Sequence, residues 1–235
     1  MVSFQRLRVI VFLASEKREL SGFAKHLTDI KGARVTLDYA HEAQLRGEPV
    51  LLAANGSGFR LAREGAESIA NAYSDIEAFV TTGFCGGLDP SLEAGEVVVG
   101  TEIGGEEAAV PGTDRKFRSG AVLSQDRVAD CATEKAGLAR TGAIAVEMEA
   151  GGVAAYVRSR NIPFFCVKVV TDTARESFPI DFNRMRDSRG AFSRARIARA
   201  ALRHPFLLFP RLMELDRKCK KAAAILGDFL ADCRY

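Results

Sequence analysis

The sequence contains no tryptophan, three histidines and seven prolines in 235 residues. The histidines form no HExxH motif or other ligand cluster, so the sequence predicts no metal site. Scarce proline, and 21 glycines that follow no repeat, exclude collagen-like and low-complexity proteins. No apolar run approaches the ~20 residues that a membrane-spanning helix needs. The N-terminal run Val9–Ala14 is too short for the apolar core of a signal peptide and is predicted to be a strand.

Cysteine is present but shows no pairing pattern. The five residues are odd in number and include no CxxC motif. Free thiols are typical of a reducing compartment, so we expect a cytoplasmic protein. The cysteines concerned are Cys85, Cys131, Cys166, Cys219 and Cys233.

Charge is nearly balanced overall but is unevenly distributed. The net charge is 33 − 30 = +3, whereas the segment from Arg184 to Lys221 carries twelve Lys/Arg against three Asp/Glu, a local charge of 12 − 3 = +9. Residues 191–235 are predicted to form a basic helical extension, interrupted at His204–Pro210. Two interpretations stay open: an outer helix with a solvated basic face, or a peripheral contact with an anionic inner-membrane surface. No nucleic-acid-binding motif accompanies these charges, so no nucleic acid partner is expected.

Apolar runs alternate with helical patterns along most of the chain. The runs RVIVFLA (Arg8–Ala14) and PFFCVKVV (Pro163–Val170) are typical of strands buried on both faces, and Ser15 is predicted to cap a helix that reaches about Leu27. This alternation predicts an α/β fold: a single domain with a central mixed, largely parallel sheet flanked by helices. Residues 1–190 would form the catalytic domain, on or beside which the extension packs.

Glycines and acids follow five of the predicted strands. Because ligands bind at the carboxyl ends of such strands, these positions are candidate site residues. Each also has a structural explanation. An acid in the first turn of a helix is favoured by the helix dipole, and an aspartate after a strand often caps a turn. The segment Gly56-Ser57-Gly58 lacks the third glycine of a dinucleotide-binding motif, because Leu61 occupies that place. The acids concerned are Glu16, Glu147, Glu149 and Asp172.

Four segments together resemble the purine nucleoside phosphorylase/nucleosidase superfamily, above all its methylthioadenosine/S-adenosylhomocysteine nucleosidases and hopanoid-associated members. They are the strand and loop ending in Glu16, TTGFCGGLDPSLEAGEVVV (Thr81–Val99), AIAVEMEAGGVAA (Ala143–Ala155) and IPFFCVKVVTDTA (Ile162–Ala174). The resemblance spans about residues 8–175. It implies an enzyme that cleaves the N-glycosidic bond of an adenine nucleoside and needs no cofactor.

The resemblance also implies roles for individual residues. Asp172 would protonate N7 of the leaving adenine, Glu149 would bind the ribose 2′- and 3′-hydroxyls, and Glu16 would activate the attacking water. The chemistry agrees, because cleavage through an oxocarbenium-like sugar needs an acid at the leaving group. Burial at the end of a strand would raise the pKa of Asp172 and keep it protonated.

Further substrate-binding residues follow from the same resemblance. Met148 would pack on the sugar, Val128 and Ala129 would hold the base through backbone contacts, and Cys85 and Gly86 would line the cleft. Thr171 and Glu147 are placed beside them, Glu147 as a positioning neighbour. The family also leads us to expect a homo-oligomer, with a dimer favoured.

The chain departs from the family at two places that concern the nucleophile and the substrate. Phosphorylases hold phosphate with charged donors where this chain has Thr81 and Phe84, so we favour water as the nucleophile. Phosphate remains the alternative, with Gly56, Gly58 and Thr82 as its candidate region. The stretch between Val99 and Leu123 is shorter than nucleosidases usually have, which would admit a bulky 5′ substituent.

These departures, with the basic tail, suggest an adenosyl-lipid such as adenosylhopane as substrate. Three other functions remain open. They are a methylthioadenosine/S-adenosylhomocysteine nucleosidase, a phosphate-dependent phosphorylase, and a nucleoside-binding protein without turnover.

Overall fold

A computed structural model describes residues 8–187, 192–203 and 205–235. Its centre is a set of four parallel strands, in which β1 (Val9–Ala14) lies between β4 (Glu48–Ala54) and β5 (Ile76–Gly87), and β5 also pairs with β10 (Phe164–Asp172). Every residue of β10 is buried. The continuous apolar run that predicted this strand is therefore explained by cover on both of its faces.

The sheet closes on itself on one side and extends on the other. From β10 it continues through β6 (Val97–Ile103), β8 (Arg118–Ser124) and β9 (Ala145–Glu147), and β9 returns to β5. On the open side, β3 (Tyr39–Leu45) and β2 (Thr28–Gly32) follow β4 in antiparallel order. The short β7 (Glu106–Glu107) pairs with β6. The predicted mixed α/β architecture is confirmed, and the parallel pairs lie at its centre.

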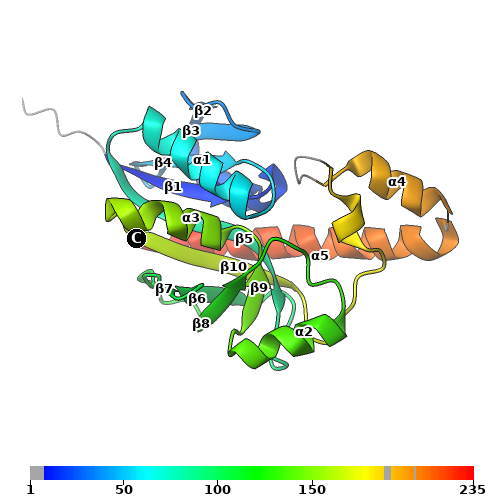
Figure 1. Cartoon of the computed structure of the whole chain (residues 1–235). Helices are drawn as coiled ribbons and strands as arrows, with labels where there is room; N and C mark the ends of the chain where they lie inside the picture. The colour runs from blue at the N-terminus through cyan, green and yellow to red at the C-terminus, as the bar shows by residue number, and fades with distance from the viewer. Residues whose placement is uncertain (1–7, 188–191, 204) are drawn as a thin grey trace, which may run out of the picture.

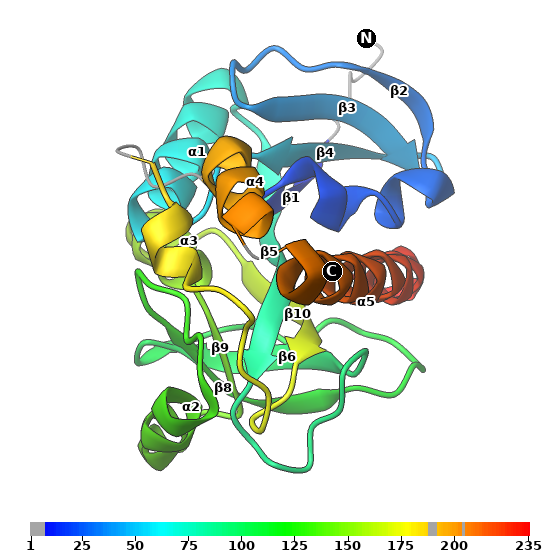
Figure 2. The same ribbon diagram turned by 90° about the vertical axis from the view of Figure 1, so that its right-hand side faces the viewer.

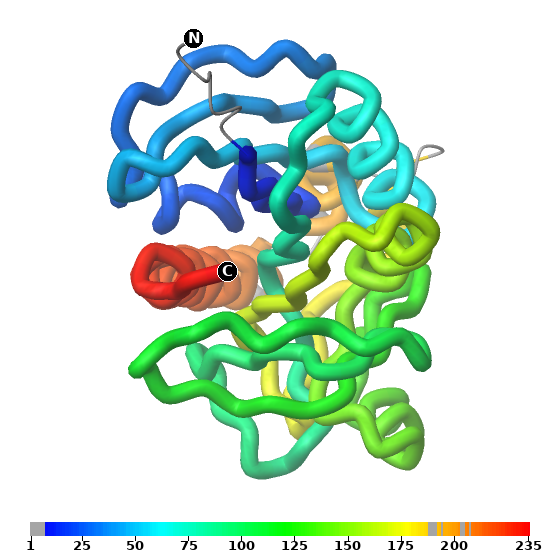
Figure 3. The backbone as a smooth tube through the Cα atoms, turned by 90° about the vertical axis from the view of Figure 1, so that its left-hand side faces the viewer, coloured from blue at the N-terminus to red at the C-terminus, as the bar shows by residue number. Residues whose placement is uncertain are grey.

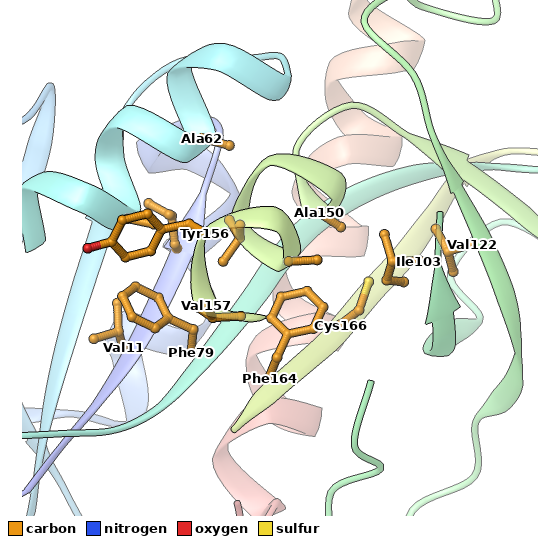
Figure 4. Close-up of a cluster of buried hydrophobic side chains, with 14 of the residues drawn as sticks. Val11, Ala62, Phe79, Ile103, Val122, Ala150, Tyr156, Val157, Phe164 and Cys166 are labelled. Carbon is orange, nitrogen blue, oxygen red and sulfur yellow. The ribbon is translucent and has the colours of Figure 1, made fainter. Parts of the chain in front are cut away.

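Helices cover both faces of the sheet (Figure 1). α1 (Phe59–Ala72) and α3 (Ala150–Val157) pack on one face, where a cluster of buried side chains includes Val11, Phe79 and Phe164 (Figure 4). The opposite face is covered by α5 (Pro205–Asp232) and by two 3-10 helices, η1 (Lys17–Leu20) and η2 (Phe23–His26). Figure 3 shows α5 running between the N-terminal strands and the closed part of the sheet.

The remaining helices lie at the periphery. α2 (Ala132–Leu138) continues into η3 (Ala139–Thr141), and η4 (Arg158–Arg160) extends α3. η5 (Phe182–Met185) and α4 (Arg194–Arg203) connect β10 to α5. No helix in the described ranges is long and apolar enough to cross a membrane.

Two local predictions were wrong. The helix expected after Ser15 is broken into η1 and η2, between which Ser21 and Gly22 form a turn. Pro210 does not interrupt the C-terminal helix but lies inside α5. Proline costs a helix one backbone hydrogen bond and crowds the carbonyl four residues earlier, and here it sits in the exposed early part of a helix whose later turns are packed in the core. His204, and the predicted boundary between residues 190 and 191, lie outside the described residues.

Candidate functional site

The glycines and acids that follow separate strands in the sequence are brought together at one end of the sheet. Contacts link the five strand ends, and β5 pairs with β9 through Gly86 and Gly87. The Gly56 N–H donates to the Ser15 carbonyl at 2.9 Å, which links the ends of β4 and β1. The Gly58 N–H donates to Glu149 Oε1 at 3.1 Å, and Asp172 lies opposite Gly86 in the β10–β5 register. This is the edge at which parallel strands bind ligands.

A buried lysine, Lys168 of β10, holds two of the acids. Its ammonium lies 2.8 Å from Glu147 Oε2 and 3.7 Å from Glu149 Oε2, and it donates to the Thr82 carbonyl at 3.2 Å. The Lys168 and Glu147 side chains are completely buried. Glu147 also accepts the backbone N–H groups of Glu149 and Ala150. It is therefore a structural acid that fixes the start of α3.

The two glutamates differ in their affinity for a proton. Burial acts to raise the pKa of Glu147, but the adjacent Lys168 ammonium and the hydrogen bonds from Ser124 and Ala150 together lower it. Burial raises the pKa of Glu149 to about 8, because Lys168 is farther from it and the charges of Glu147 and Glu19 add repulsion. The structure thus separates an ionised glutamate from one that holds a proton near neutral pH.

Glu19, not Glu16, is the N-terminal acid that lies in the interior. Glu19 Oε2 accepts hydrogen bonds from the Ser15 N–H and hydroxyl at 2.9 Å each and from the Glu16 N–H at 3.0 Å, and Oε1 accepts the Phe84 N–H at 3.2 Å. The Glu16 side chain instead pairs with the exposed Arg18. The turn of η1 carries position 19 back under the end of β1, which the expected regular helix did not predict.

Asp172, at the end of β10, is paired with a second buried lysine. Lys135 of α2 is fully buried and places its ammonium 2.5 Å from Asp172 Oδ2. It also donates to the carbonyls of Thr173 and Glu176. Burial raises the pKa of Asp172, and the Lys135 charge opposes that rise without cancelling it. A side chain at position 86 would crowd the acid, since a Cβ there would lie 3.0 Å from Asp172 Oδ2.

The segment predicted to hold a base is occupied by another part of the chain. The Val128 N–H donates to Asn183 Oδ1 at 2.8 Å, and Asn183 Nδ2 donates to the Val128 carbonyl at 3.0 Å. Asn183 belongs to η5, in the segment that follows Asp172. Arg186, three residues further along the same segment, donates to the carbonyls of Ser57 and Asp126.

The other predicted residues lie close by, with different surroundings. Met148 is buried between β9 and α3, and Ala129 is buried beside Val128. The Thr171 hydroxyl lies 2.8 Å from Asp172 Oδ1 and 3.3 Å from the Cys85 carbonyl. The hydroxyl of Thr82 is buried without a hydrogen-bond partner.

Sequence reasoning missed both lysines, for different reasons. Lys168 interrupts an apolar strand, and a charge in a fully buried strand signals a buried counter-charge. Lys135 lies in a short polar helix and gives no such signal.

Three potential metal ligands, in Asp130, Cys131 and Glu134, have ligand atoms within 4.8 Å of one another. Glu134 pairs with Arg127, and acidic groups near the surface are common without an ion.

The pKa of Glu149 makes stability depend on pH. In the folded protein Glu149 holds its proton up to about pH 8, against 4.5 for the ordinary group, so the folded state binds more protons between these values and stability falls as pH rises through them. The slope for one group is at most about 1.4 kcal/mol per pH unit. We expect Glu149→Gln to flatten this dependence and to be more stable than wild type at the alkaline end, as measured by urea unfolding at a series of pH values.

Glu147→Gln is the matched control for this prediction. It leaves the Lys168 ammonium without its nearest carboxylate, so we expect a loss of roughly 3–5 kcal/mol across the same pH range. Parallel stability curves for wild type and Glu149→Gln would contradict the assignment of a raised pKa to Glu149.

Comparison with known proteins finds relatives in sequence and in fold. The 5′-methylthioadenosine/S-adenosylhomocysteine nucleosidase of Glaesserella parasuis is 25% identical over 76% of this chain and 90% of its own length. The solved structure of the enzyme of that name from Neisseria meningitidis, in complex with methylthio-immucillin-A, matches 96% of this chain and 98% of its own with a TM-score of 0.69 at 20% identity. Futalosine hydrolase of Helicobacter pylori matches 96% and 97% with a TM-score of 0.69 at 15% identity.

The two solved structures show that the fold is shared. The model of the phosphorylase superfamily matches residues 8–116 and 106–203, which is most of the chain. This match includes every strand of the sheet and all the acids of the site. The resemblance inferred from the sequence is confirmed, and the chain belongs to the phosphorylase superfamily.

Proposed function

We propose that the protein hydrolyses the N-glycosidic bond of a 5′-substituted adenine nucleoside and releases adenine. The observation that carries this proposal is the set of three buried carboxylates, Asp172, Glu149 and Glu19, at the carboxyl ends of neighbouring strands. Two of them have raised pKa values, and the third has its oxygens held by backbone N–H groups. The names of the relatives in the same superfamily support a nucleosidase.

The reaction needs one acid and one base. Asp172 gives its proton to N7 of adenine, the C1′–N9 bond breaks with its electron pair going to the base, and the sugar becomes oxocarbenium-like. Water then adds to C1′ and loses a proton to Glu19. Glu149 accepts hydrogen bonds from the ribose hydroxyls, and Met148 packs beside the sugar.

Lys135 acts on this reaction through Asp172. The ammonium occupies Oδ2 as a hydrogen-bond donor, so Oδ1, beside the Thr171 hydroxyl, is the oxygen that can carry the transferable proton. When that proton leaves, the Asp172 carboxylate is already paired with a cation. Lys135 therefore positions the acid and stabilises its ionised product.

Asn183 indicates how the base is held. Its side-chain amide accepts from the Val128 N–H and donates to the Val128 carbonyl. Adenine offers the same pairing through N1, an acceptor, and its 6-amino group, a donor. A base bound to Val128 would replace the Asn183 amide with the same number of hydrogen bonds, which supports the predicted role of the Val128 backbone. Ala129 would then lie beside the base.

The surroundings of Glu19 favour water over phosphate. The Glu19 carboxylate accepts the Phe84 N–H and lies against Gly83. Both residues belong to the segment that matches the phosphate-holding segment of phosphorylases. A buried negative charge there would repel a phosphate anion. The contacts of Arg186 near Gly56–Gly58 keep phosphorolysis as the second candidate, because a guanidinium is a strong phosphate partner.

The 5′ substituent is the finer part of the proposal. The short stretch between Val99 and Leu123 and the basic tail favour an adenosyl-lipid such as adenosylhopane, whereas the relatives' names favour methylthioadenosine. Adenine release from the two nucleosides by purified protein separates these substrates. A clear preference for methylthioadenosine would contradict the lipid hypothesis.

Replacing the proposed acid tests the reaction itself. We expect Asp172→Asn to bind nucleoside but to release adenine ~10²–10⁴ times more slowly, since a positioned acid contributes that much to rate. The measurements are single-turnover adenine release and equilibrium binding of the same nucleoside. Full activity in Asp172→Asn would rule out Asp172 as the acid, and binding without any release by wild type would indicate a binding protein.

The two N-terminal glutamates form a matched pair for testing the base. We expect Glu19→Gln to lose most of the hydrolytic rate, because the neutral amide cannot accept a proton from water. Glu16→Gln removes the exposed pair with Arg18 and should leave the rate nearly unchanged. The comparison is kcat at one pH with folding checked by circular dichroism. The opposite ranking of the two variants would return the role to Glu16.

A further inference from the structure

The helices before the C-terminal core stand away from the rest of the molecule. We call α4 and residues 205–217 of α5 the helical hairpin. Figure 1 shows the hairpin extending beyond the sheet, and Figure 2 views it along α5. α5 is continuously packed only from about Cys219 onward, where its buried residues join the core. Among the described side chains of residues 205–217, only Leu208 is buried.

The hairpin concentrates exposed apolar side chains. Leu202 is 78% exposed, Phe206 97%, Phe209 59% and Met213 52%. In the described part of the chain, these are four of the seven exposed large hydrophobic residues, and all four fall within residues 202–213. Phe206, Phe209 and Met213 are spaced by three and four residues, so they line one side of the helix. Such a row is costly in water and marks a surface that contacts something apolar.

Cations surround this apolar row. Exposed basic side chains occur before the row on α4 and within and after it on α5, at Arg196, Arg199, Arg211, Arg217, Lys220 and Lys221. The described acids of the hairpin are Glu214 and Asp216, each of which pairs with a lysine. Apolar residues flanked by an excess of arginine and lysine are typical of a helix that lies in the interface of an anionic membrane.

The hairpin is also connected to the candidate site. The segment that follows Asp172 leads into α4, and Arg196 of α4 donates to the Arg186 carbonyl. Lys218 of α5 pairs with Glu176 at 2.5 Å, and the Glu176 carbonyl is one of the groups that hold Lys135. In Figure 1 the hairpin projects from the end of the molecule at which β10 finishes. A surface bound to the hairpin would therefore face the carboxyl ends of the strands.

We propose that the helical hairpin docks the protein on an anionic lipid surface. Phe206, Phe209, Met213 and Leu202 enter the interfacial layer while the arginines and lysines meet the lipid phosphates. Docking goes beyond the proposed reaction and does not depend on it. If the nucleoside carries a lipid at its 5′ position, docking brings the site to the layer in which that substrate resides.

Vesicle sedimentation with the full chain and no nucleoside tests the proposal. We expect the protein to pellet with phosphatidylcholine vesicles that contain phosphatidylglycerol, to pellet much less with phosphatidylcholine alone, and to be released by added salt. The double variant Phe206→Ser/Phe209→Ser should bind at least about tenfold more weakly, since it removes two apolar anchors. Arg199→Glu/Arg211→Glu should lose the preference for phosphatidylglycerol.

Ile30→Ser is the matched control, because Ile30 is 46% exposed on β2, outside the hairpin. It should bind vesicles like wild type. Adenine release from a soluble nucleoside should be the same in wild type and Phe206→Ser/Phe209→Ser, which shows that the variant is folded and separates this test from the reaction.

Three results would overturn the proposal. The first is wild-type protein that does not pellet with anionic vesicles, or that pellets equally with neutral ones. The second is a wild-type protein that does not bind vesicles and is a dimer by light scattering without lipid, while Phe206→Ser/Phe209→Ser is a monomer. The hairpin would then be an interface between copies of the chain. The third is binding to duplex nucleic acid without binding to vesicles.

Discussion

The site depends on the pairing of the buried Lys168 ammonium with carboxylates. The Lys168 side chain extends from β10 to Glu147 at the end of β9, to Glu149 at the start of α3 and to the Thr82 carbonyl of β5. Two carboxylates and a lysine could not be buried together without such pairing, because each charge alone would lose several kcal/mol of hydration. The pairing also holds three elements of the sheet in one register around the proposed sugar site.

A second lysine, Lys135, repeats this arrangement at the proposed base end of the site with a different outcome. Lys168 is close enough to keep Glu147 ionised, whereas burial prevails for Asp172 despite Lys135 at 2.5 Å. The strand ends thus carry an acid that positions backbone groups and an acid that can hold a proton. Environments that move the pKa values of neighbouring carboxyl groups apart are the means by which one site performs acid and base chemistry.

The parts of the site that could be predicted are those with a local signature. Asp172 and Glu149 were predicted because each is an acid at the end of an apolar run, and burial there is costly without a partner. The role of Glu16 was taken from the family resemblance, and Glu19 was not predicted. The break at Ser21 and Gly22, which replaces the regular helix expected after Ser15, is set by packing against α5. Lys135 and Asn183 reach the site only through tertiary contacts, so no motif or residue spacing in the sequence predicts their positions.

The fold shows the same division. Buried runs such as β10 were predicted from their apolar sequence, while the exposed strand β2 and the course of α5 through Pro210 were not. The helix tolerates Pro210 because its later turns, around Leu226 and Phe229, are held by the core. In α5, tertiary packing therefore outweighs local propensity.

In the proposed reaction Asp172 delivers the proton, and the Lys135 ammonium sets the pKa of that acid. The most direct test is the pH dependence of kcat for adenine release in wild type, Lys135→Met and Lys135→Arg. Because the Lys135 charge lowers the pKa of Asp172, we expect the alkaline fall in kcat to move to higher pH in Lys135→Met and to move much less in Lys135→Arg. An unmoved alkaline limb in Lys135→Met, or one displaced to lower pH, would contradict the account.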